Sequence, residues 1–130
     1  MSDWYDFDFA LIRLVPCVHR GNAMNIGLAM YAPTAGFIQA IFVDDLEPLQ
    51  GFAPHVDLSR LELYLSSLEA IAAGAPGPIG SMSKSERFHW LTAPRSDIIQ
   101  STAPHPGRTQ DLALTFKNLF EREVLAGLPR

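Results

Sequence analysis

Four polar residues towards the carboxyl-terminal end of the chain could together hold an anion. Arg95 and Ser96 follow directly after Pro94, and Gln100 and His105 come a short way further along. A guanidinium forms paired hydrogen bonds to carboxylate or phosphate oxygens, and the free backbone N–H groups of a turn can add to them. These four residues are therefore the best candidate in the sequence for binding a small anionic ligand.

Ser96 and His105 are also the residue types of a nucleophile and its general base. A carboxylate orients the histidine in such a pair, and the sequence identifies none for this role. The chain has no GxGxxG, P-loop, HExxH or GxSxG motif. We therefore predict no catalytic residue and no cofactor. The alternative is that Arg95 pairs with a nearby acid, Ser96 bonds its own turn and His105 is solvated.

Two further polar residues interrupt apolar strand patterns and are candidate ligand contacts. Arg13 lies within the first apolar stretch, where a half-buried guanidinium needs a carboxylate, phosphate or carbonyl partner. Asn25 and Gly27 break the second stretch, and glycine in a strand often marks a bulge or a close approach of backbone. A structural role and a ligand-binding role are both compatible with Arg13 and Asn25.

Cysteine and histidine usage predicts no metal site. His19, His55, His89 and His105 are scattered, and none stands at a ligand spacing from another His or Cys. The single cysteine, Cys17, excludes an intramolecular disulfide and a multi-cysteine zinc site. It falls in an apolar strand pattern, which predicts a buried structural thiol.

The first half of the chain shows the periodicity of three strands and a helix. Alternating apolar residues predict strands over 4–18, 24–32 and 37–43, and their short connections indicate an antiparallel meander. A helical turn is predicted at about 46–50. Asp57 is a good N-cap for a helix whose apolar residues recur at spacings of three and four, and Gly74 ends it.

The second half predicts a hairpin and a second helix. Strands are expected at about 87–92 and 97–101 around a turn at 93–95, with loops at 75–85 and 103–107. In the first of these strands Phe88 and Trp90 would face the core, while Arg87 and His89 would be exposed. Thr109 would cap the final helix. The predicted fold is α+β, with an antiparallel β-meander, a C-terminal β-hairpin and two main helices packed on the sheet, in a single domain over 1–130.

Composition narrows the classes of function. The 130 residues are 48% hydrophobic and 18% charged, with a formal net charge of −4, which is typical of a globular chain and argues against nucleic-acid binding. The acidic, aromatic amino terminus is not a signal peptide, and no stretch is apolar enough to span a membrane. We therefore expect a cytoplasmic protein. Its low charge content leaves apolar surface that a homodimer or another partner would cover.

The chain resembles an uncharacterised bacterial family known as domain of unknown function 3037. The likeness is carried by the strand from Tyr5 to Pro16, by Asn25-Ile26-Gly27, and by the stretch from Arg87 to Ser96 with Gln100 and His105. It covers nearly the whole chain and implies no activity. It does imply partnership with a kinase similar to the toxin kinase HipA, because members are encoded beside such kinases.

These observations favour a non-enzymatic interaction or accessory module, with a HipA-like kinase as the partner that the resemblance implies. The alternative is a protein or enzyme that binds a small anionic ligand through Arg95, Ser96, Gln100 and His105, with Arg13 and Asn25 as further contacts. The two hypotheses differ in geometry, because the second requires these side chains to converge on one pocket.

Overall fold

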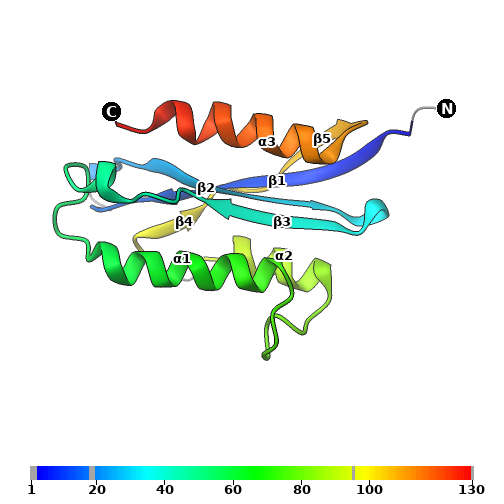
Figure 1. Cartoon of the computed structure of the whole chain (residues 1–130), viewed down its shortest axis with the longest axis horizontal. Helices are drawn as coiled ribbons and strands as arrows, with labels where there is room; N and C mark the ends of the chain where they lie inside the picture. Colours follow the sequence, from blue (N-terminus) through cyan, green and yellow to red (C-terminus); the bar gives the residue numbers. More distant parts are fainter. Residues whose placement is uncertain (1–2, 18–19, 95, 130) are drawn as a thin grey trace.

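The computed structural model describes residues 3–17, 20–94 and 96–129. These residues form a five-stranded antiparallel sheet between two layers of helix, with α3 on one face and α1 and α2 on the other (Figure 1). The main elements are β1 (Tyr5–Leu14), β2 (Met24–Ala32), β3 (Phe37–Phe42), α1 (Leu58–Ala72), α2 (Lys84–Thr92), β4 (Ile99–Ser101), β5 (His105–Thr109) and α3 (Leu112–Glu123). The predicted α+β class is confirmed.

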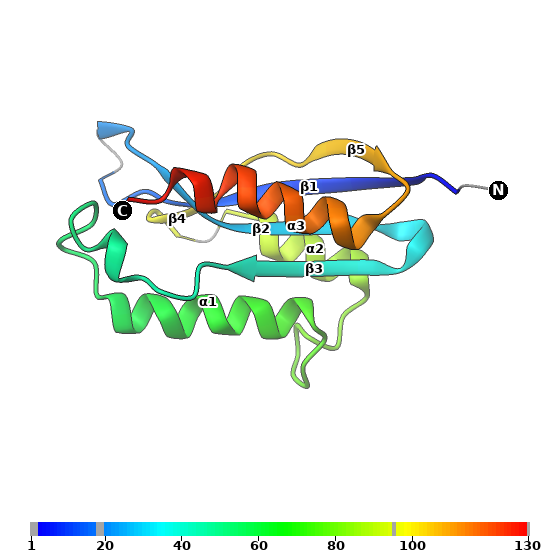
Figure 2. The ribbon, with the colours of Figure 1, turned by 45° about the horizontal axis from the view of Figure 1, so that its top comes forward.

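β1 is the central strand of the sheet. β2 pairs with one side of it and β3 lies beyond β2, so the predicted meander is confirmed, and β2 has the predicted bounds. Two short strands share the other side of β1. β5 pairs with residues 5–9 and β4 with residues 12–14, so they lie at opposite ends of β1 (Figure 2).

Strand alternation divides the core into two clusters, one on each face of the sheet. Phe7 of β1 packs towards α3, in a cluster completed by Leu28, Met30, Ala32, Leu112, Phe116 and Leu119. Ile12 and Leu14 of β1 face the other way and contact the cluster beneath α1 and α2. Both faces of β1 are therefore buried, as its continuous apolar sequence predicts.

α1 begins and ends where the sequence predicts. The Asp57 carboxylate accepts hydrogen bonds from the backbone N–H groups of Ser59 and Arg60, at 3.1 and 3.2 Å. Gly74 stands just past the helix with φ at +81°, the left-handed conformation that closes a helix at low cost. The helical turn expected before α1 is also present, at Glu47–Leu49.

The predicted strand over 87–92 is wrong, because this segment is helix α2. Ser83 and Glu86 form a capping box: the Ser83 hydroxyl accepts from the Glu86 N–H, and the Glu86 carboxylate accepts from the Ser83 N–H. On a helix Arg87, Phe88 and Leu91 share one face, and all three are buried. Phe88 is therefore in the core as predicted, whereas Arg87 is not exposed.

The predicted C-terminal hairpin is also wrong. β4 and β5 pair with β1 and not with each other, and β5 replaces most of the loop predicted over 103–107. Pro106 can stand in β5 because an edge strand has an outward side that needs no N–H donor. The cap of α3 is Asp111, whose carboxylate accepts from the Leu114 N–H at 3.0 Å; the predicted cap, Thr109, instead accepts from the Asp111 N–H at 3.1 Å.

Candidate functional site

A groove of about 610 Å³ opens between the first half of α1 and the segment that joins α2 to β4. Its walls are mainly apolar and come from three parts of the chain that are far apart in sequence. The lining residues are Pro16, His55, Val56, Asp57, Arg60, Leu61, Tyr64, Trp90, Ser96, Ile98 and Ile99. Ligand sites in proteins have comparable volumes and a similar mixture of apolar walls with few polar groups.

One wall of the groove is a flank of α1, and the N-cap and periodicity of this helix determine which residues lie on it. Arg60 and Tyr64 are one turn apart, so they lie on the same flank of α1, beside the face that carries Leu61 into the core. Tyr64 is half-buried and packs against the core cluster beneath α1. Asp57 fixes the start of the helix and therefore the position of this flank.

The opposite wall is built by the end of α2 and a turn stabilised by a side chain. Trp90 stands in the last turn of α2 and is half-buried against the same cluster as Tyr64. The Ser96 hydroxyl accepts from the backbone N–H groups of Ile98 and Ile99, at 3.2 and 3.4 Å. This turn leaves Ile98 36% exposed in the groove, although it is a large apolar side chain.

Three polar residues of the groove stand on its α1 side, across from Ser96. His55, Asp57 and Arg60 are all exposed. The Asp57 carboxylate is occupied by the helix N-terminus, whereas Arg60 forms no ion pair with any carboxylate in the described part of the chain. The groove therefore combines two half-buried aromatic rings with one guanidinium that is available to an incoming group.

Three of the sequence-predicted site residues lie in one row across the sheet, on the face covered by α3. Arg13 of β1 stands opposite Asn25 of β2 and opposite Gln100 of β4. The Asn25 amide donates to the backbone oxygen of Glu123 at the end of α3, at 2.9 Å, and the Gln100 amide donates to the Asp97 oxygen at 2.8 Å. Arg13 is half-buried and forms no ion pair with a described carboxylate.

The other predicted residues lie elsewhere. His105 stands opposite Phe9 on β5, and their ring centroids are 5.5 Å apart. Along β1 this position is four residues from the row that holds Gln100, about 13 Å of strand. Ser96 lines the groove beside α1, and Arg95 lies outside the described residues, as does His19. The structure thus does not bring Ser96, Gln100 and His105 together.

Sequence reasoning missed the aromatic pair of the groove. The sequence pattern does not single out Tyr64, and it predicts a core position for Trp90 from a strand alternation where the structure has helix α2. The signal that could have found this wall is the spacing of Ser83 and Glu86, which is the sequence signature of a capping box. A helix over 84–92 places Trp90 near its end, beside the turn that leads to Ser96.

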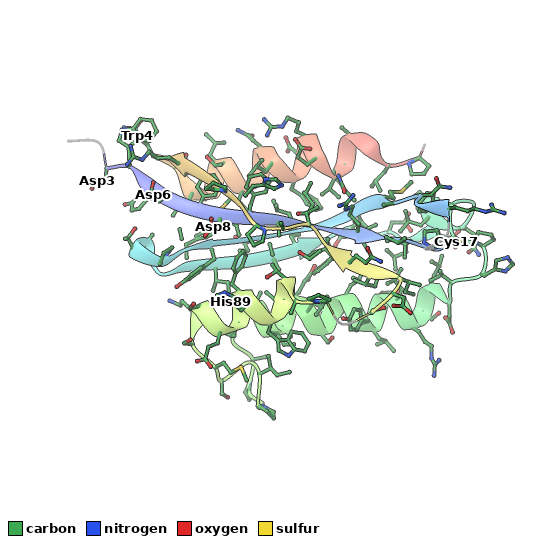
Figure 3. All side chains as sticks on the ribbon, turned by 180° about the vertical axis from the view of Figure 1, so that it is seen from behind. Asp3, Trp4, Asp6, Asp8, Cys17 and His89 are labelled. Carbon is green, nitrogen blue, oxygen red and sulfur yellow. The ribbon has the colours of Figure 1, made fainter. Side chains whose placement is uncertain are left out.

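Other predicted features can be compared with the described residues. Cys17 is half-buried, whereas the sequence predicts a buried thiol, and it is a free cysteine. Figure 3 shows Cys17 at the opposite end of the sheet from Trp4 and Asp6. The same view shows His89 on α2. No group of three or more His, Cys, Asp or Glu side chains in the described ranges could hold a metal ion. Among these residues no helix has the length and apolar character needed to cross a membrane.

Fold and groove together define an α+β domain with helices on both faces of an antiparallel sheet and an aromatic groove at one side. A family model described as "Protein of unknown function (DUF3037)" matches residues 9–124, and the chain belongs to this family. No curated protein and no solved structure matches the chain.

Proposed function

We propose that this protein is a non-enzymatic interaction module that binds an apolar segment of a partner protein in the groove beside α1. The observation that carries the proposal is the exposure of Ile98 in a groove of about 610 Å³ that Tyr64 and Trp90 also line. Aromatic side chains that line a concave apolar surface are common anchors of protein recognition.

The charged residue Arg60 in the groove suggests how a partner would be oriented. Arg60 lines the groove, is exposed and forms no ion pair with a described carboxylate. A carboxylate on the partner could bind it through two parallel hydrogen bonds, which gives geometric specificity. The segment that fits best therefore has an aliphatic or aromatic anchor and an acidic residue beside it.

A HipA-like kinase is the first partner to test, on the strength of the family resemblance. The protein would act on such a kinase by occupying a surface segment of it, since binding in the groove requires no chemistry from the groove itself. Binding of the purified kinase can be measured by isothermal titration calorimetry, and co-purification followed by mass spectrometry covers other partners.

Two matched variants make this experiment specific. Ile98→Asp places a charge in the groove, and Leu114→Asp makes the same change on α3, on the other face of the sheet, where Leu114 is 52% exposed. We expect Ile98→Asp to weaken partner binding by about 30-fold or more, because an unpaired charge would have to be desolvated. Leu114→Asp should bind normally. Equal binding by the two variants, or no reproducible partner, would contradict the proposal.

A second candidate function is binding of a small anionic ligand in the same groove. It is favoured by one observation: Ser96, one of the residues predicted to hold an anion, lies in the groove that Arg60 also lines. The ligand would need an apolar body and an anionic group, and His105, which stands opposite Phe9 on β5, would not reach it. Arg95 retains its predicted role in this candidate.

An NMR titration with an aryl carboxylate such as 3-phenylpropionate distinguishes the two candidates. Saturable shifts confined to the groove residues and lost in Arg60→Ala would support the small-ligand function. Shifts that appear only with the partner protein, and are lost in Ile98→Asp, would support the interaction module.

A further inference from the structure

The residues that precede β1 carry an exposed aromatic side chain. Trp4 is 57% exposed, although it is a large apolar residue. Pairing of β1 with β5 ends at Tyr5, which stands opposite Thr109, so Asp3 and Trp4 lie beyond the paired part of the strand. Asp3 is exposed and forms no ion pair within the part of the chain that the structure describes. This segment therefore presents an aromatic side chain with an available carboxylate beside it.

The groove beside α1 is suited to an occupant with these two features. Tyr64, Trp90 and the exposed Ile98 contribute to its apolar walls. Arg60 lines the same groove and forms no ion pair with a described carboxylate. An indole ring offers a large apolar surface to such walls, and a carboxylate forms strong hydrogen bonds with a guanidinium. The Trp4 segment and the groove are therefore complementary in apolar character and in charge.

The groove of its own chain is out of reach of Trp4. Trp4 precedes β1, whereas Pro16, which lines the groove, follows it. β1 is a strand of 10 residues, so roughly 33 Å of extended chain lies between them. In Figure 1 the start of β1 and the start of α1 lie at opposite ends of the molecule. Because pairing holds β1 in the sheet from Tyr5 onward, Trp4 can enter this groove only on a second copy of the chain.

We propose that Trp4 of one copy of this chain binds in the groove beside α1 of a second copy, with Asp3 next to Arg60. The inference rests on the proposed function, because it uses the same groove as a docking site, and it adds the chain's own amino-terminal segment as an occupant. The segment then competes with a partner protein for the same apolar walls.

The positions of the Trp4 segment and the groove permit a closed dimer. They lie at opposite ends of β1, so two copies that run in opposite directions can exchange both contacts about a two-fold axis. A single contact consists of one aromatic side chain and one exposed ion pair, which is a small interface. We expect a dissociation constant of about 0.1–1 mM for the single contact.

Two variants separate the Trp4 segment from the groove. Trp4→Ala removes the aromatic side chain and keeps the groove, whereas Ile98→Asp disables the groove and keeps Trp4. The chain has 2 tryptophans, so Trp90 is the remaining one in Trp4→Ala and its indole N–H resonance reports on the groove. The experiment is an NMR titration of isotopically labelled Trp4→Ala with unlabelled Ile98→Asp. The matched control titrant is the double variant Trp4→Ala/Ile98→Asp, and circular dichroism checks that each variant is folded.

We expect Ile98→Asp to cause saturable shifts of the Trp90 indole and of neighbouring groove residues, and the double variant to cause none. Adding Arg60→Glu to the labelled chain should raise the dissociation constant by about fivefold or more, because it reverses the charge that Asp3 meets. The proposal is overturned by an absence of shifts at roughly 1 mM, by shifts outside the groove or by equal shifts with the double variant. An unchanged affinity of the Arg60→Glu chain overturns it as well.

Failure of this inference is distinguishable from failure of the proposed function. A chain that binds a partner protein, but shows no shifts with Ile98→Asp, retains the interaction module and loses self-binding alone. A chain that shows the shifts, but binds no partner protein reproducibly, retains self-binding and loses the interaction module.

Discussion

Replacing Arg87 by methionine should destabilise the protein, because this side chain joins α2 to the end of α1. Arg87 is 7% exposed, and its Nη1 donates to the backbone oxygens of Ile71 and Ala72, at 3.2 and 3.0 Å. These oxygens belong to the last turn of α1, where carbonyl groups lack their usual helical partner, although the Ile71 oxygen also accepts from the Gly74 N–H at 3.0 Å. The guanidinium therefore caps α1 from a neighbouring helix.

The magnitude follows from what the substitution removes. Two hydrogen bonds from a charged donor contribute about 3–6 kcal/mol together. Nε of Arg87 is buried and has no partner among the described residues. An unsatisfied buried donor costs about 1–3 kcal/mol, so its removal returns about this much to the free energy of unfolding. Methionine fills much of the same space. We expect a net loss of about 2–3 kcal/mol in the free energy of unfolding, or about 10 °C in the midpoint of thermal unfolding.

Urea denaturation followed by far-ultraviolet circular dichroism measures this loss. Arg87→Lys should lose less, because it keeps the charge and can reach one of the two oxygens. His89→Met changes an exposed residue of the same helix and should stay within about 0.5 kcal/mol of the wild type. A loss below about 1 kcal/mol for Arg87→Met would refute the capping role that we assign to Arg87.

Three further substitutions test the fold by the same measurement. Gly27→Ala should cost about 1–3 kcal/mol, because a Cβ at this position would overlap the Phe42 ring; an unchanged stability would mean that the ring is free to move aside. Asp57→Ala should cost about 1 kcal/mol through loss of the α1 cap, and a neutral result would show that the cap is not needed. Asp6→Asn should change stability by less than about 0.5 kcal/mol, since the ion pair with Arg108 is exposed; a larger loss would contradict this.

Sequence periodicity was sufficient to predict the bounds of an element where one pattern dominated the segment. β2 has the predicted bounds, and Asp57 and Gly74 delimit α1, because alternation and helical caps act locally. The bulge expected from Asn25 and Gly27 is present too, as a shift in the pairing of β1 with β2 after Ile12. Each of these features depends on residues that are neighbours in sequence.

The errors arose where local patterns were ambiguous or where pairing was distant. In residues 87–92 the alternation of polar and aromatic residues competes with a capping box, and tertiary burial of Arg87 favours the helix. β5 was predicted as a loop because of Pro104, Pro106 and Gly107, and only its distant partner β1 makes it a strand. The groove was unpredictable for the same reason, since its walls meet only after the chain has folded.

β1 pairs along one side with β4 and β5, two strands that come much later in the chain. β1 is made early in synthesis, but its outer side pairs with residues as far away as Thr109, which stands opposite Tyr5. Pairings at such large sequence separation form slowly, because a long loop must close first. During synthesis β1 to β3 can assemble as a meander whose two edges are both open. One edge closes only when β4 and β5 emerge, so the central strand of the sheet is completed last.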